Sequence, residues 1–357
     1  MSKYQLSCKR RILLNRILAR IFSSVISLAF LGSALSAHAA NVTVLVRPGA
    51  PMFQPGEKTP SGMLVFPTIQ NALDHAPQPT DGGRIIIRIT PGVYHERIWV
   101  AQNRPNVELL GLGKTAADTV IVSNHYAKES GGTFFTETAE IAGDGFIADN
   151  VTFENNAGRV GQALAISVLA DRAIFKHCRF LGYQDTLFAN YGRQYYVDDY
   201  ISGAVDFIFG DATAVFDHSV IHSIGRGYIT AQSRLSAAST TGYVIRDSQI
   251  TLAPGIGENG QYVALGRPWR YYARVIYLNT YMPNGILPQG FGDWGYPPNE
   301  KTAFYAEAGC KGPGANPSAR ISWERKLTSA EIESFQPQKF LRGSDAWNPV
   351  AEAAMLP

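Results

Sequence analysis

Residues 180–185 read Phe-Leu-Gly-Tyr-Gln-Asp, and residues 201–206 read Ile-Ser-Gly-Ala-Val-Asp. The two hexapeptides align with a constant offset of 21 residues, so that an apolar residue, a glycine and an aspartate recur at matching places. A period of about 20 to 30 residues is typical of one coil of a solenoid. If each copy forms one coil, Asp185 and Asp206 stack at the spacing of neighbouring strands, about 4.8 Å.

Two carboxyl groups that lie so close cannot both ionise easily, because each charge disfavours the other. One pKa is then raised and the other can be held down, which makes an acid and a nucleophile from one residue type. The repeat therefore points to a fold and, in the same residues, to a site.

The apolar position of the repeat recurs over a long part of the chain. The intervals are 27, 21, 20, 29 and 31 residues between Phe153, Phe180, Ile201, Ile221, Ile250 and Tyr281. Short β-rich segments between these positions are bounded by glycine, asparagine and aspartate. A βαβ fold needs a crossover of a dozen or more residues between parallel strands, and these intervals leave no room for one. The sequence therefore predicts an all-β parallel β-helix.

Short helices are expected at the two ends of this solenoid, because its open ends need covers. Thr68 precedes an apolar stripe in residues 69–73 and is a candidate N-cap. Residues 328–331 read Thr-Ser-Ala-Glu, which is a capping-box pattern.

Residues 1–39 have the composition of an export signal. Six basic residues and no acidic ones accompany an apolar run at about residues 21–35, which is followed by Ala-His-Ala at 37–39. The run is shorter than the roughly 18 residues that a single-pass anchor, the alternative, would need. We expect cleavage near Ala39 and Ala40, which leaves residues 40–357 as a single, secreted, monomeric domain with no membrane attachment.

Removal of that signal changes the charge balance. The chain has 32 Lys and Arg residues against 29 Asp and Glu residues, and removing six basic residues leaves 26 against 29, a net charge of −3. No basic run remains, so nucleic acid and anionic lipid are not expected partners. Cys178 and Cys310 also remain. The position of Cys178 in the repeat favours a buried thiol, and the sequence leaves open whether the two cysteines pair.

Several chemistries are excluded by their motifs. The chain has no Gly-x-Ser-x-Gly elbow, and residues 95–99 begin like a zinc-binding His-Glu-x-x-His motif but end in Trp99. One column of the repeat, three residues before the apolar position, contains only polar side chains: Asn150, His177, Asp198, His218 and Asp247. A metal stripe is one interpretation, but metal ligands need convergent geometry, so a polar face of the repeat is favoured.

The remaining polar residues fit acyl transfer. Gln162 lies about one coil before Asp185, Gln184 directly precedes it, and Arg267 stands in a Leu-Gly-Arg-Pro-Trp segment. A neutral amide can donate to an oxyanion without disturbing a nearby carboxylate. An arginine fork can hold a carboxylate ionised and oriented. One aspartate would attack, the other would move protons, and the amides would receive the developing charge.

Five ordered segments resemble the signature blocks of pectin methylesterases. They read Gly-Val-Tyr-His-Glu at 92–96, Gly-Gln-Ala-Leu-Ala at 161–165, Gly-Tyr-Gln-Asp-Thr-Leu at 182–187, Asp-Phe-Ile-Phe-Gly at 206–210 and Leu-Gly-Arg-Pro-Trp at 265–269. The resemblance extends from about residue 42 to about residue 323. It implies a right-handed parallel β-helix that demethylates homogalacturonan without a metal or other cofactor. His95, Leu164 and Ile166 depart from the usual blocks, outside the catalytic positions.

The resemblance also implies roles for individual residues. Asp206 matches the nucleophile, Asp185 the acid and then base, Gln162 and Gln184 the oxyanion hole, and Arg267 the residue that orients Asp206. Trp269 and Phe209 match positions that line the sugar cleft. Tyr94 and Glu96 fall in a block that we interpret as structural. Arg234 is a candidate ligand for uronate carboxylates, with a solvated surface arginine as the alternative. The export signal without an inhibitory pro-region is more similar to bacterial members.

Two other classes stay open at this point. A glycosidase or lyase on the same fold would also use carboxylates in a cleft, but it would cut the chain. A non-catalytic polysaccharide-binding solenoid or a thioesterase relative would share the fold alone. The glutamine pair disfavours the first class, and the combination of Asp185, Asp206 and Arg267 disfavours the second.

Overall fold

The computed structural model describes residues 40–50 and 62–357, and these residues belong to one compact unit. The predicted export signal, residues 1–39, lies outside the described residues. Most of the described elements are short strands, because segments rich in β-branched and aromatic residues are separated by turns of glycine, asparagine and aspartate. No described helix is both long enough and apolar enough to cross a bilayer.

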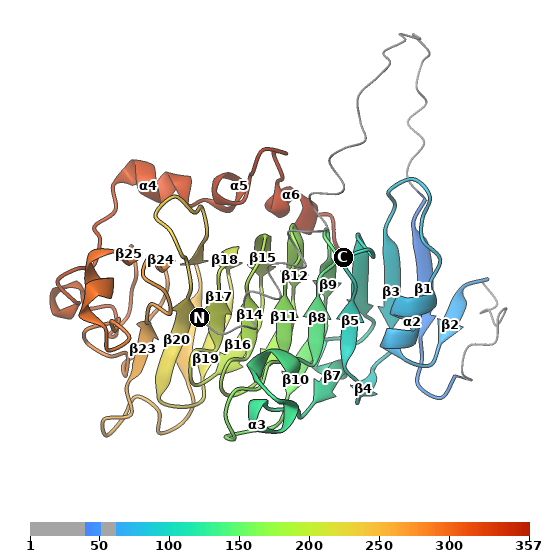
Figure 1. The fold of residues 1–357 in the computed structure, drawn as a ribbon, viewed down its shortest axis with the longest axis horizontal. Helices are drawn as coiled ribbons and strands as arrows, with labels where there is room; N and C mark the ends of the chain where they lie inside the picture. The colour runs from blue at the N-terminus through green and yellow to red at the C-terminus, as the bar shows by residue number, and fades with distance from the viewer. Residues whose placement is uncertain (1–39, 51–61) are drawn as a thin grey trace, which may run out of the picture. The chain divides into compact units, whose positions relative to one another are not determined.

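The described strands form three parallel sheets that wind around one axis as a right-handed β-helix (Figure 1). The first sheet contains, in spatial order, β2 (Leu64–Phe66), β1 (Val42–Val46), β3 (Ile85–Ile89), β6 (Val107–Gly111), β9 (Ile147–Asp149), β12 (Ala173–Lys176), β15 (Arg193–Val197), β18 (Thr213–Asp217), β21 (Gly242–Arg246), β24 (Arg274–Leu278) and β25 (Phe304–Ala308). The second contains β22 (Gln249–Leu252), β19 (Val220–Ser223), β16 (Tyr200–Gly203), β13 (Arg179–Leu181), β10 (Thr152–Asn155), β7 (Thr119–Ser123) and β4 (Gly92–Tyr94). The third contains β23 (Val263–Gly266), β20 (Gly227–Gln232), β17 (Ile208–Gly210), β14 (Leu187–Ala189), β11 (Ile166–Val168), β8 (Ala139–Ile141) and β5 (Ile98–Val100).

The register of the second sheet confirms the repeat that the sequence predicts. Phe153 pairs with Phe180, Phe180 with Ile201, Ile201 with Ile221, and Ile221 with Ile250. All five side chains are fully buried in the interior of the solenoid. Stacking of equivalent apolar residues from successive coils therefore builds one continuous core.

The last apolar position that the sequence predicts for this repeat, Tyr281, is wrong by one residue. Tyr281 pairs with Gln249, so the partner of Ile250 is the next residue, Met282. Met282 is fully buried, whereas Tyr281 is 44% exposed. Successive side chains of a strand point to opposite faces, so a shift of one residue exchanges core and solvent. An aromatic residue at the expected spacing caused the error.

The polar column has a conformational explanation. Asn150, His177, Asp198, His218 and Asp247 all have positive φ values, between 47° and 59°. Each follows a strand of the first sheet and lies two residues before a strand of the second. Asparagine, aspartate and histidine are the non-glycine residues that most often adopt this left-handed conformation. The column therefore recurs because every coil turns the same corner.

Short helices lie mostly at the ends of the chain. They are α2 (Ile69–His75), η1 (Ala116–Asp118), α3 (Ala127–Ser130), η2 (Thr133–Phe135), η3 (Pro297–Lys301), η4 (Pro317–Ala319), α4 (Ser329–Ser334), α5 (Pro337–Phe340) and α6 (Pro349–Ala353). Helix α2 begins after Thr68, whose hydroxyl accepts from the Asn71 N–H at 3.1 Å, which confirms the predicted N-cap. The Glu96 carboxylate accepts from the N–H groups of Ile69 and Gln70 at 2.9 and 3.0 Å, so Glu96 has a structural role at this helix.

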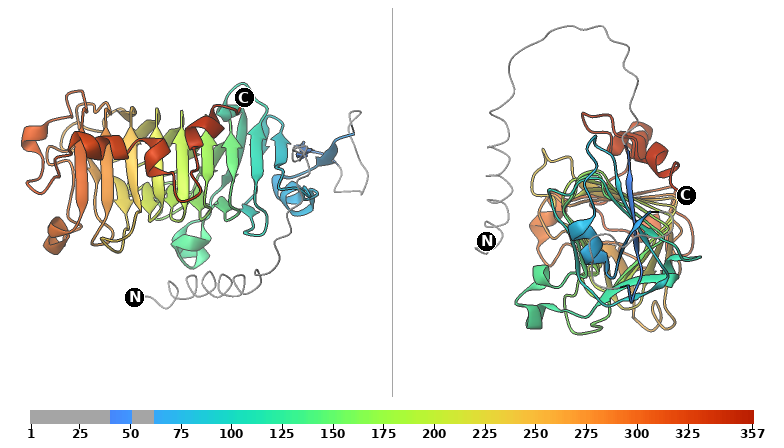
Figure 2. Two further views of the ribbon diagram at one scale, coloured as in Figure 1. Left: turned by 90° about the horizontal axis from the view of Figure 1, so that it is seen from above. Right: turned by 90° about the vertical axis from the view of Figure 1, so that its right-hand side faces the viewer.

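The C-terminal helices do not cap the end of the solenoid, which corrects the expectation for residues 328–335. The capping box itself is present, since the Glu331 carboxylate accepts from the Thr328 N–H and the Thr328 hydroxyl accepts from the Glu331 N–H. However, α4, α5 and α6 run along the first sheet (Figure 2). They pack Phe335, Leu341 and Trp347 against a row of outward-facing apolar side chains, which includes Ile174, Val215, Val244 and Ile276. That row needs a cover because it would otherwise expose apolar surface.

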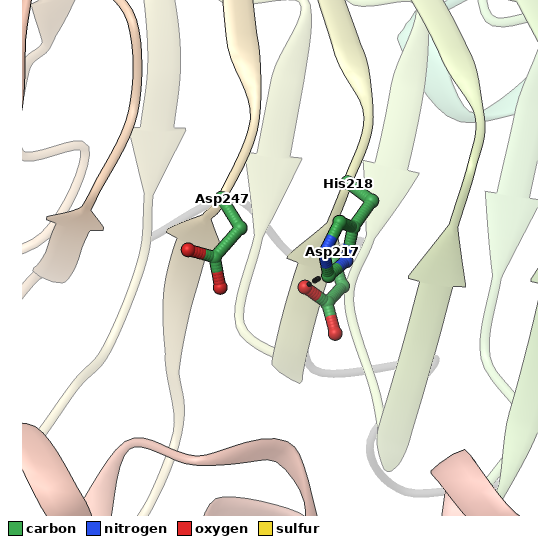
Figure 3. A group of neighbouring side chains, drawn as sticks. All are labelled: Asp217, His218 and Asp247. Carbon is green, nitrogen blue, oxygen red and sulfur yellow. Dashed lines mark ion pairs between the residues drawn. The ribbon is translucent and has the colours of Figure 1, made fainter.

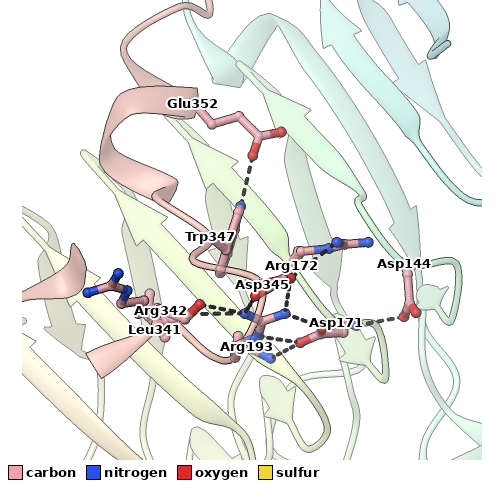
Figure 4. A network of polar contacts seen from close by, with 9 residues as sticks. All are labelled: Asp144, Asp171, Arg172, Arg193, Leu341, Arg342, Asp345, Trp347 and Glu352. Carbon is pink, nitrogen blue, oxygen red and sulfur yellow. Dashed lines mark hydrogen bonds and ion pairs between the residues drawn. The ribbon is translucent and has the colours of Figure 1, made fainter. Parts of the chain in front are cut away.

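One arginine ties this C-terminal segment to the coils (Figure 4). The Arg193 guanidinium donates to the Asp171 carboxylate at 2.9 and 2.6 Å and to the Asp345 carboxylate at 2.5 and 2.9 Å. It also donates to the carbonyls of Leu341 and Arg342. The paired guanidinium holds the pKa of Asp345 well below its usual range. These charge-assisted bonds hold the segment that contains α4, α5 and α6 on the first sheet.

The two cysteines of the described region are both free thiols. Cys178 is 1% exposed, which confirms the prediction of a buried thiol, and burial raises its pKa well above the usual value. The backbone N–H of Cys178 donates to the Asp199 carboxylate of the next coil at 2.6 Å.

Candidate active site

Asp185 and Asp206 lie side by side where the chain enters the third sheet. Gln184 bridges to Val205 and Leu187 pairs with Ile208, so the 21-residue offset holds on both sides of the aspartates. Both aspartates have positive φ, 63° and 50°, in the turns that lead into β14 and β17. Their backbone N–H groups donate to the Val205 and Tyr228 carbonyls of the next coils, at 3.0 and 2.7 Å. The repeat thus fixes both residues through the backbone.

The two carboxyl groups differ in their partners. The Arg267 Nε and Nη2 groups donate to Oδ1 and Oδ2 of Asp206 at 2.9 and 2.6 Å, a bidentate pair. In the described structure the Asp185 carboxyl group makes no hydrogen bond. Both side chains are nearly buried, with Asp185 9% and Asp206 6% exposed. The Asp206 carboxylate is therefore bound to a guanidinium, whereas the Asp185 carboxyl group is bound to no cation.

This asymmetry separates their protonation. Burial and the adjacent Asp206 charge raise the pKa of Asp185 well above its usual value, against a smaller lowering by Arg267. Burial also raises the pKa of Asp206, but the hydrogen bonds and charge of Arg267 oppose that rise. The environment therefore favours the protonated form at Asp185 and, through Arg267, the ionised form at Asp206.

The two glutamines are neighbours in successive coils. Gln162 bridges directly to Gln184, so its coil partner is Gln184 and not Asp185. The chain gains one residue here, because the offset is 22 between the glutamines but 21 between Ile166 and Leu187. Within the described residues neither side-chain amide makes a hydrogen bond, and both are partly exposed. Two amides beside the aspartates are thus available to an oxygen atom of a ligand.

Aromatic side chains extend from this cluster along the outer face of the third sheet. Phe188 and Phe209 alternate with Leu187 and Ile208 of the core, so their rings point outward. The rings of Phe188 and Phe209 stack at 4.7 Å, and the Phe209 ring lies 5.8 Å from that of Trp269. The structure thereby brings Phe209 and Trp269 together, and their role in lining a sugar cleft stays a prediction.

Sequence reasoning missed several aromatic residues of this wall and of the surroundings of Arg267. Phe188 follows from the same 21-residue offset applied backward from Phe209, so the repeat held a usable signal. Phe134 lies 4.8 Å from the Phe188 ring and comes from η2, outside the repeat. Tyr228 and Trp294 contact the Arg267 guanidinium, with ring centroids 4.5 and 4.0 Å from its Cζ atom. No periodicity predicts Phe134 or Trp294, because both stand in insertions between strands.

Arg234 is used differently from the other candidates. Its side chain is 9% exposed, and its guanidinium donates to the carbonyls of Ser239, at 2.9 Å, and Ala237. These bonds hold the loop that follows β20. Binding of a uronate by Arg234 stays a prediction, and it would require these bonds to be shared or broken.

Two residues of the polar column and the neighbouring Asp217 form a group that could hold a metal ion. Asp217, His218 and Asp247 place one ligand atom each within 4.8 Å of one another (Figure 3). The carboxylates already have partners, however. Arg246 lies 2.5 Å from Asp247 and 3.7 Å from Asp217, and Asn279 donates to Asp247 at 2.9 Å. A guanidinium between the two carboxylates supplies the charge that a cation would supply, so we assign no metal to this group.

Comparison with known proteins agrees with this geometry. The pectinesterase family profile matches residues 59–344. Pectinesterase 31 of Arabidopsis thaliana is 40% identical over 286 residues, which are 77% of this chain and 88% of the relative. The solved pectin methylesterase from carrot is 29% identical and superposes with a TM-score of 0.78, over 90% of this chain and 98% of that one.

A second solved structure is a pectin methylesterase in complex with a hexasaccharide. It is 28% identical to this chain, with a TM-score of 0.69, over 88% of this chain and 98% of the other. Since the family profile covers most of the chain and the Arabidopsis relative is matched over most of its length, this chain belongs to the pectinesterase family of carboxylic ester hydrolases.

Proposed function

We propose that the protein hydrolyses the C6 methyl esters of homogalacturonan to pectate and methanol, through an acyl-enzyme intermediate on Asp206. The single observation that carries the proposal is the bidentate pair of Arg267 and Asp206 beside a buried, unpaired Asp185. An ionised and a protonated carboxyl group that lie side by side can act as nucleophile and acid in one step. The complex of a related pectin methylesterase with a hexasaccharide supports a polysaccharide substrate.

In the first half-reaction, an ionised oxygen of Asp206 attacks the carbonyl carbon of the ester. The charge that develops on the carbonyl oxygen is received by the amide donors of Gln162 and Gln184. Asp185 gives its proton to the methoxy oxygen, the bond from carbon to that oxygen breaks, and methanol leaves. A mixed anhydride between Asp206 and the galacturonate remains, and Asp185 is now ionised.

In the second half-reaction, Asp185 acts as a base. It removes a proton from a water molecule, whose oxygen attacks the galacturonate acyl carbon, and the amide pair again receives the oxyanion. Collapse of this intermediate releases Asp206 as a carboxylate, which the Arg267 fork stabilises. Both aspartates return to their initial protonation states, so the cycle needs no group from outside the chain other than water.

The aromatic wall of Phe134, Phe188, Phe209 and Trp269 supports a role in sugar binding. Aromatic faces and a few convergent polar groups are common in ligand clefts. The wall runs across successive strands of the third sheet, and so it follows the axis of the solenoid. We propose that a polysaccharide chain lies along this axis, with one esterified residue at the aspartates and its neighbours on the aromatic rings.

The reaction type is tested by following methanol and chain length together on methylated homogalacturonan. We expect methanol release, glycosidic bonds that stay intact, and the same rate in EDTA. Depolymerisation that keeps pace with methanol release would instead support a hydrolase or lyase. Pectin binding without methanol release would support a binding protein.

The cellular setting is part of the same proposal. We propose export with cleavage near Ala40, which mass spectrometry of the secreted protein tests through its N-terminal residue. Retention of the leader in a membrane fraction would contradict it. A monomeric state is also proposed and is tested by light scattering. The bacterial type stays a prediction, which the matches to Arabidopsis and carrot proteins do not support.

A further inference from the structure

Two aromatic rings hold the guanidinium of Arg267. The Arg267 Cζ atom lies 4.0 Å from the centroid of the Trp294 ring and 4.5 Å from that of Tyr228. The same guanidinium donates through Nε and Nη2 to Asp206. Cation–π contacts at these distances attract the guanidinium to the ring faces. Arg267 is therefore restrained by two rings while its edge binds the carboxylate.

Backbone contacts place both rings at this point. The Tyr228 carbonyl accepts from the Asp206 N–H at 2.7 Å, so one residue supports both members of the ion pair. The Gly292 N–H donates to the carbonyl of Gly266, the residue before Arg267, at 3.0 Å. A Cβ atom at Gly292 would lie 2.9 Å from the Tyr228 hydroxyl, so a larger residue here would push the Tyr228 ring aside. Trp294 follows two residues later in the same loop.

Trp294 has an unusual backbone conformation. Its φ is 68°, in the left-handed region that bulky side chains rarely adopt. The turn is held by Asp293, whose carboxylate accepts from the Gly295 N–H at 2.8 Å and whose carbonyl accepts from the Asn299 amide at 2.9 Å. The side chain is still 38% exposed, so burial in a core does not explain why a tryptophan stands here. Strained residues that persist without such burial are typical of functional sites.

We propose that Trp294, together with Tyr228, is a positioning residue that fixes the plane of the Arg267 fork and so keeps both of its donors aimed at Asp206. The proposal rests on the proposed function, in which Asp206 is the nucleophile. A free arginine side chain samples many rotamers, and each departure from the bidentate geometry leaves the carboxylate with one donor or none. The two rings restrict the rotamers of Arg267 without contacting the reacting atoms.

The alternative role for an exposed tryptophan is a platform for a sugar ring, and the two roles predict different kinetics. A platform changes substrate binding, which appears in KM. A positioning residue changes the state of Asp206, which appears in kcat and in the acid limb of the pH–rate profile. The charged or titratable groups that face Asp206 are Arg267, Asp185 and the buried Tyr305. Of these, only Arg267 favours the ionised carboxylate, so a loosened fork should raise the pKa of Asp206.

The test uses Trp294→Gly, Trp294→Phe and the control Tyr296→Leu in the full-length enzyme. Glycine is comfortable at a positive φ, so Trp294→Gly removes the ring while it relieves the backbone, and we expect it to fold at least as stably as the wild type. Tyr296 is an exposed aromatic residue of the same loop whose ring contacts Tyr271 at 5.7 Å and not Arg267. It therefore controls for loss of an aromatic surface near the site.

We expect Trp294→Gly to lower kcat roughly 3- to 30-fold, the range of one cation–π contact, with KM nearly unchanged and the acid limb moved to higher pH. Trp294→Phe should keep most of the rate, and Tyr296→Leu should keep all of it. A raised KM with unchanged kcat and an unmoved acid limb would overturn the positioning role. Methanol release that survives in an Asp206→Ala variant would overturn the proposed function itself, and with it this inference.

Discussion

Two columns of polar residues run along this solenoid, and they look alike in sequence. Asp185 and Asp206 stand where the chain enters the third sheet, and Asn150, His177, Asp198, His218 and Asp247 stand between the first and second sheets. Both columns recur with the coil, and all seven residues have positive φ. Both columns therefore occupy a left-handed turn position, which asparagine, aspartate and histidine adopt more easily than most residues.

The columns differ in what the rest of the chain places beside them. Asp247 is partly exposed, and its carboxylate is held by Arg246 and Asn279 from the same and the next coil. Asp206 is 6% exposed and is held by Arg267, and Asp185 beside it has no such partner. The repeat thus explains the fold. Residues outside the repeat, such as Arg267, give Asp185 and Asp206 the surroundings of a candidate active site.

The first test of the difference between the two columns removes one aspartate from each. Asp206→Ala should lower kcat by roughly 10⁴-fold or more, because no other described group can replace the nucleophile. Asp247→Ala, the matched change in the turn column, should leave kcat within about twofold of the wild type. Methanol release from methylated pectin measures both. An Asp206→Ala enzyme that keeps more than about a hundredth of the wild-type rate would defeat the covalent role of Asp206.

Asp185→Asn should lower kcat by roughly 10²- to 10⁴-fold, the usual contribution of a positioned acid and base, while pectin binding survives. Binding is measured by isothermal titration calorimetry with an oligogalacturonate. Loss of affinity equal to the loss of rate would argue that Asp185 holds the substrate and does not transfer protons.

The same substitution has a second consequence, for stability. Because the folded-state pKa of Asp185 is raised, the folded protein binds more protons than the unfolded chain once the pH exceeds the unfolded pKa, about 3.9. The free energy of unfolding therefore falls as pH rises through this window. Asparagine has no proton to lose, so Asp185→Asn should exceed the wild type in Tm at pH 7 and match it near pH 4. A lower Tm at neutral pH would mean that burial of Asp185 carries no such cost.

Arg267→Lys keeps the positive charge and removes the fork. We expect a loss of roughly 10- to 100-fold in kcat, because one ammonium group cannot reproduce two parallel bonds to Asp206. The acid limb of the pH–rate profile should also move to higher pH, since a weaker partner opposes the raised pKa of Asp206 less strongly. Near wild-type turnover in this variant would assign Arg267 to packing or to substrate capture.

The smallest expected effect concerns stability, and it tests the conformational role of the turn residue Asp247. Asp247→Ala places an alanine at a φ of 47°, which should lower the free energy of unfolding by about 1 kcal/mol. Asp247→Gly should recover part of this loss because glycine adopts the conformation without strain. Urea denaturation measures both variants. Equal stability of the alanine variant and the wild type would remove the conformational explanation of the column.

The repeat predicts the fold well because a solenoid is nearly one-dimensional. Each coil contacts only its neighbours, so matched residues such as Phe180 and Ile201 must be adjacent once the period is known. The error at Tyr281 shows the limit, since an insertion of one residue exchanges the two faces of a strand. The place of α4 to α6 also could not be read from their sequences, because it depends on an apolar row that successive coils of the first sheet build together.

The site divides in the same way. The adjacency of Asp185 and Asp206 follows from the period, and the family motifs add Gln162, Gln184 and Arg267 to it. The contact of Arg267 with Trp294 has no signal in the spacing, because the loop of residues 291–296 is an irregular insertion. The bonds of Arg234 to its own loop are likewise a matter of local geometry. The period of a solenoid therefore does not predict the contacts of residues that stand on insertions between strands.

The central claim is that one repeat produces two aspartates with different protonation at neutral pH. The most direct test is a titration of the side-chain carboxyl groups by NMR, with ¹³C-labelled aspartate, in the wild type and in Asp185→Asn and Asp206→Asn. We predict one resonance that titrates well above the usual range, that disappears in Asp185→Asn, and that moves to lower pH in Asp206→Asn, because the neighbouring charge is gone. A high-pKa resonance that persists in Asp185→Asn and vanishes in Asp206→Asn would contradict the account, because it would exchange the acid and the nucleophile.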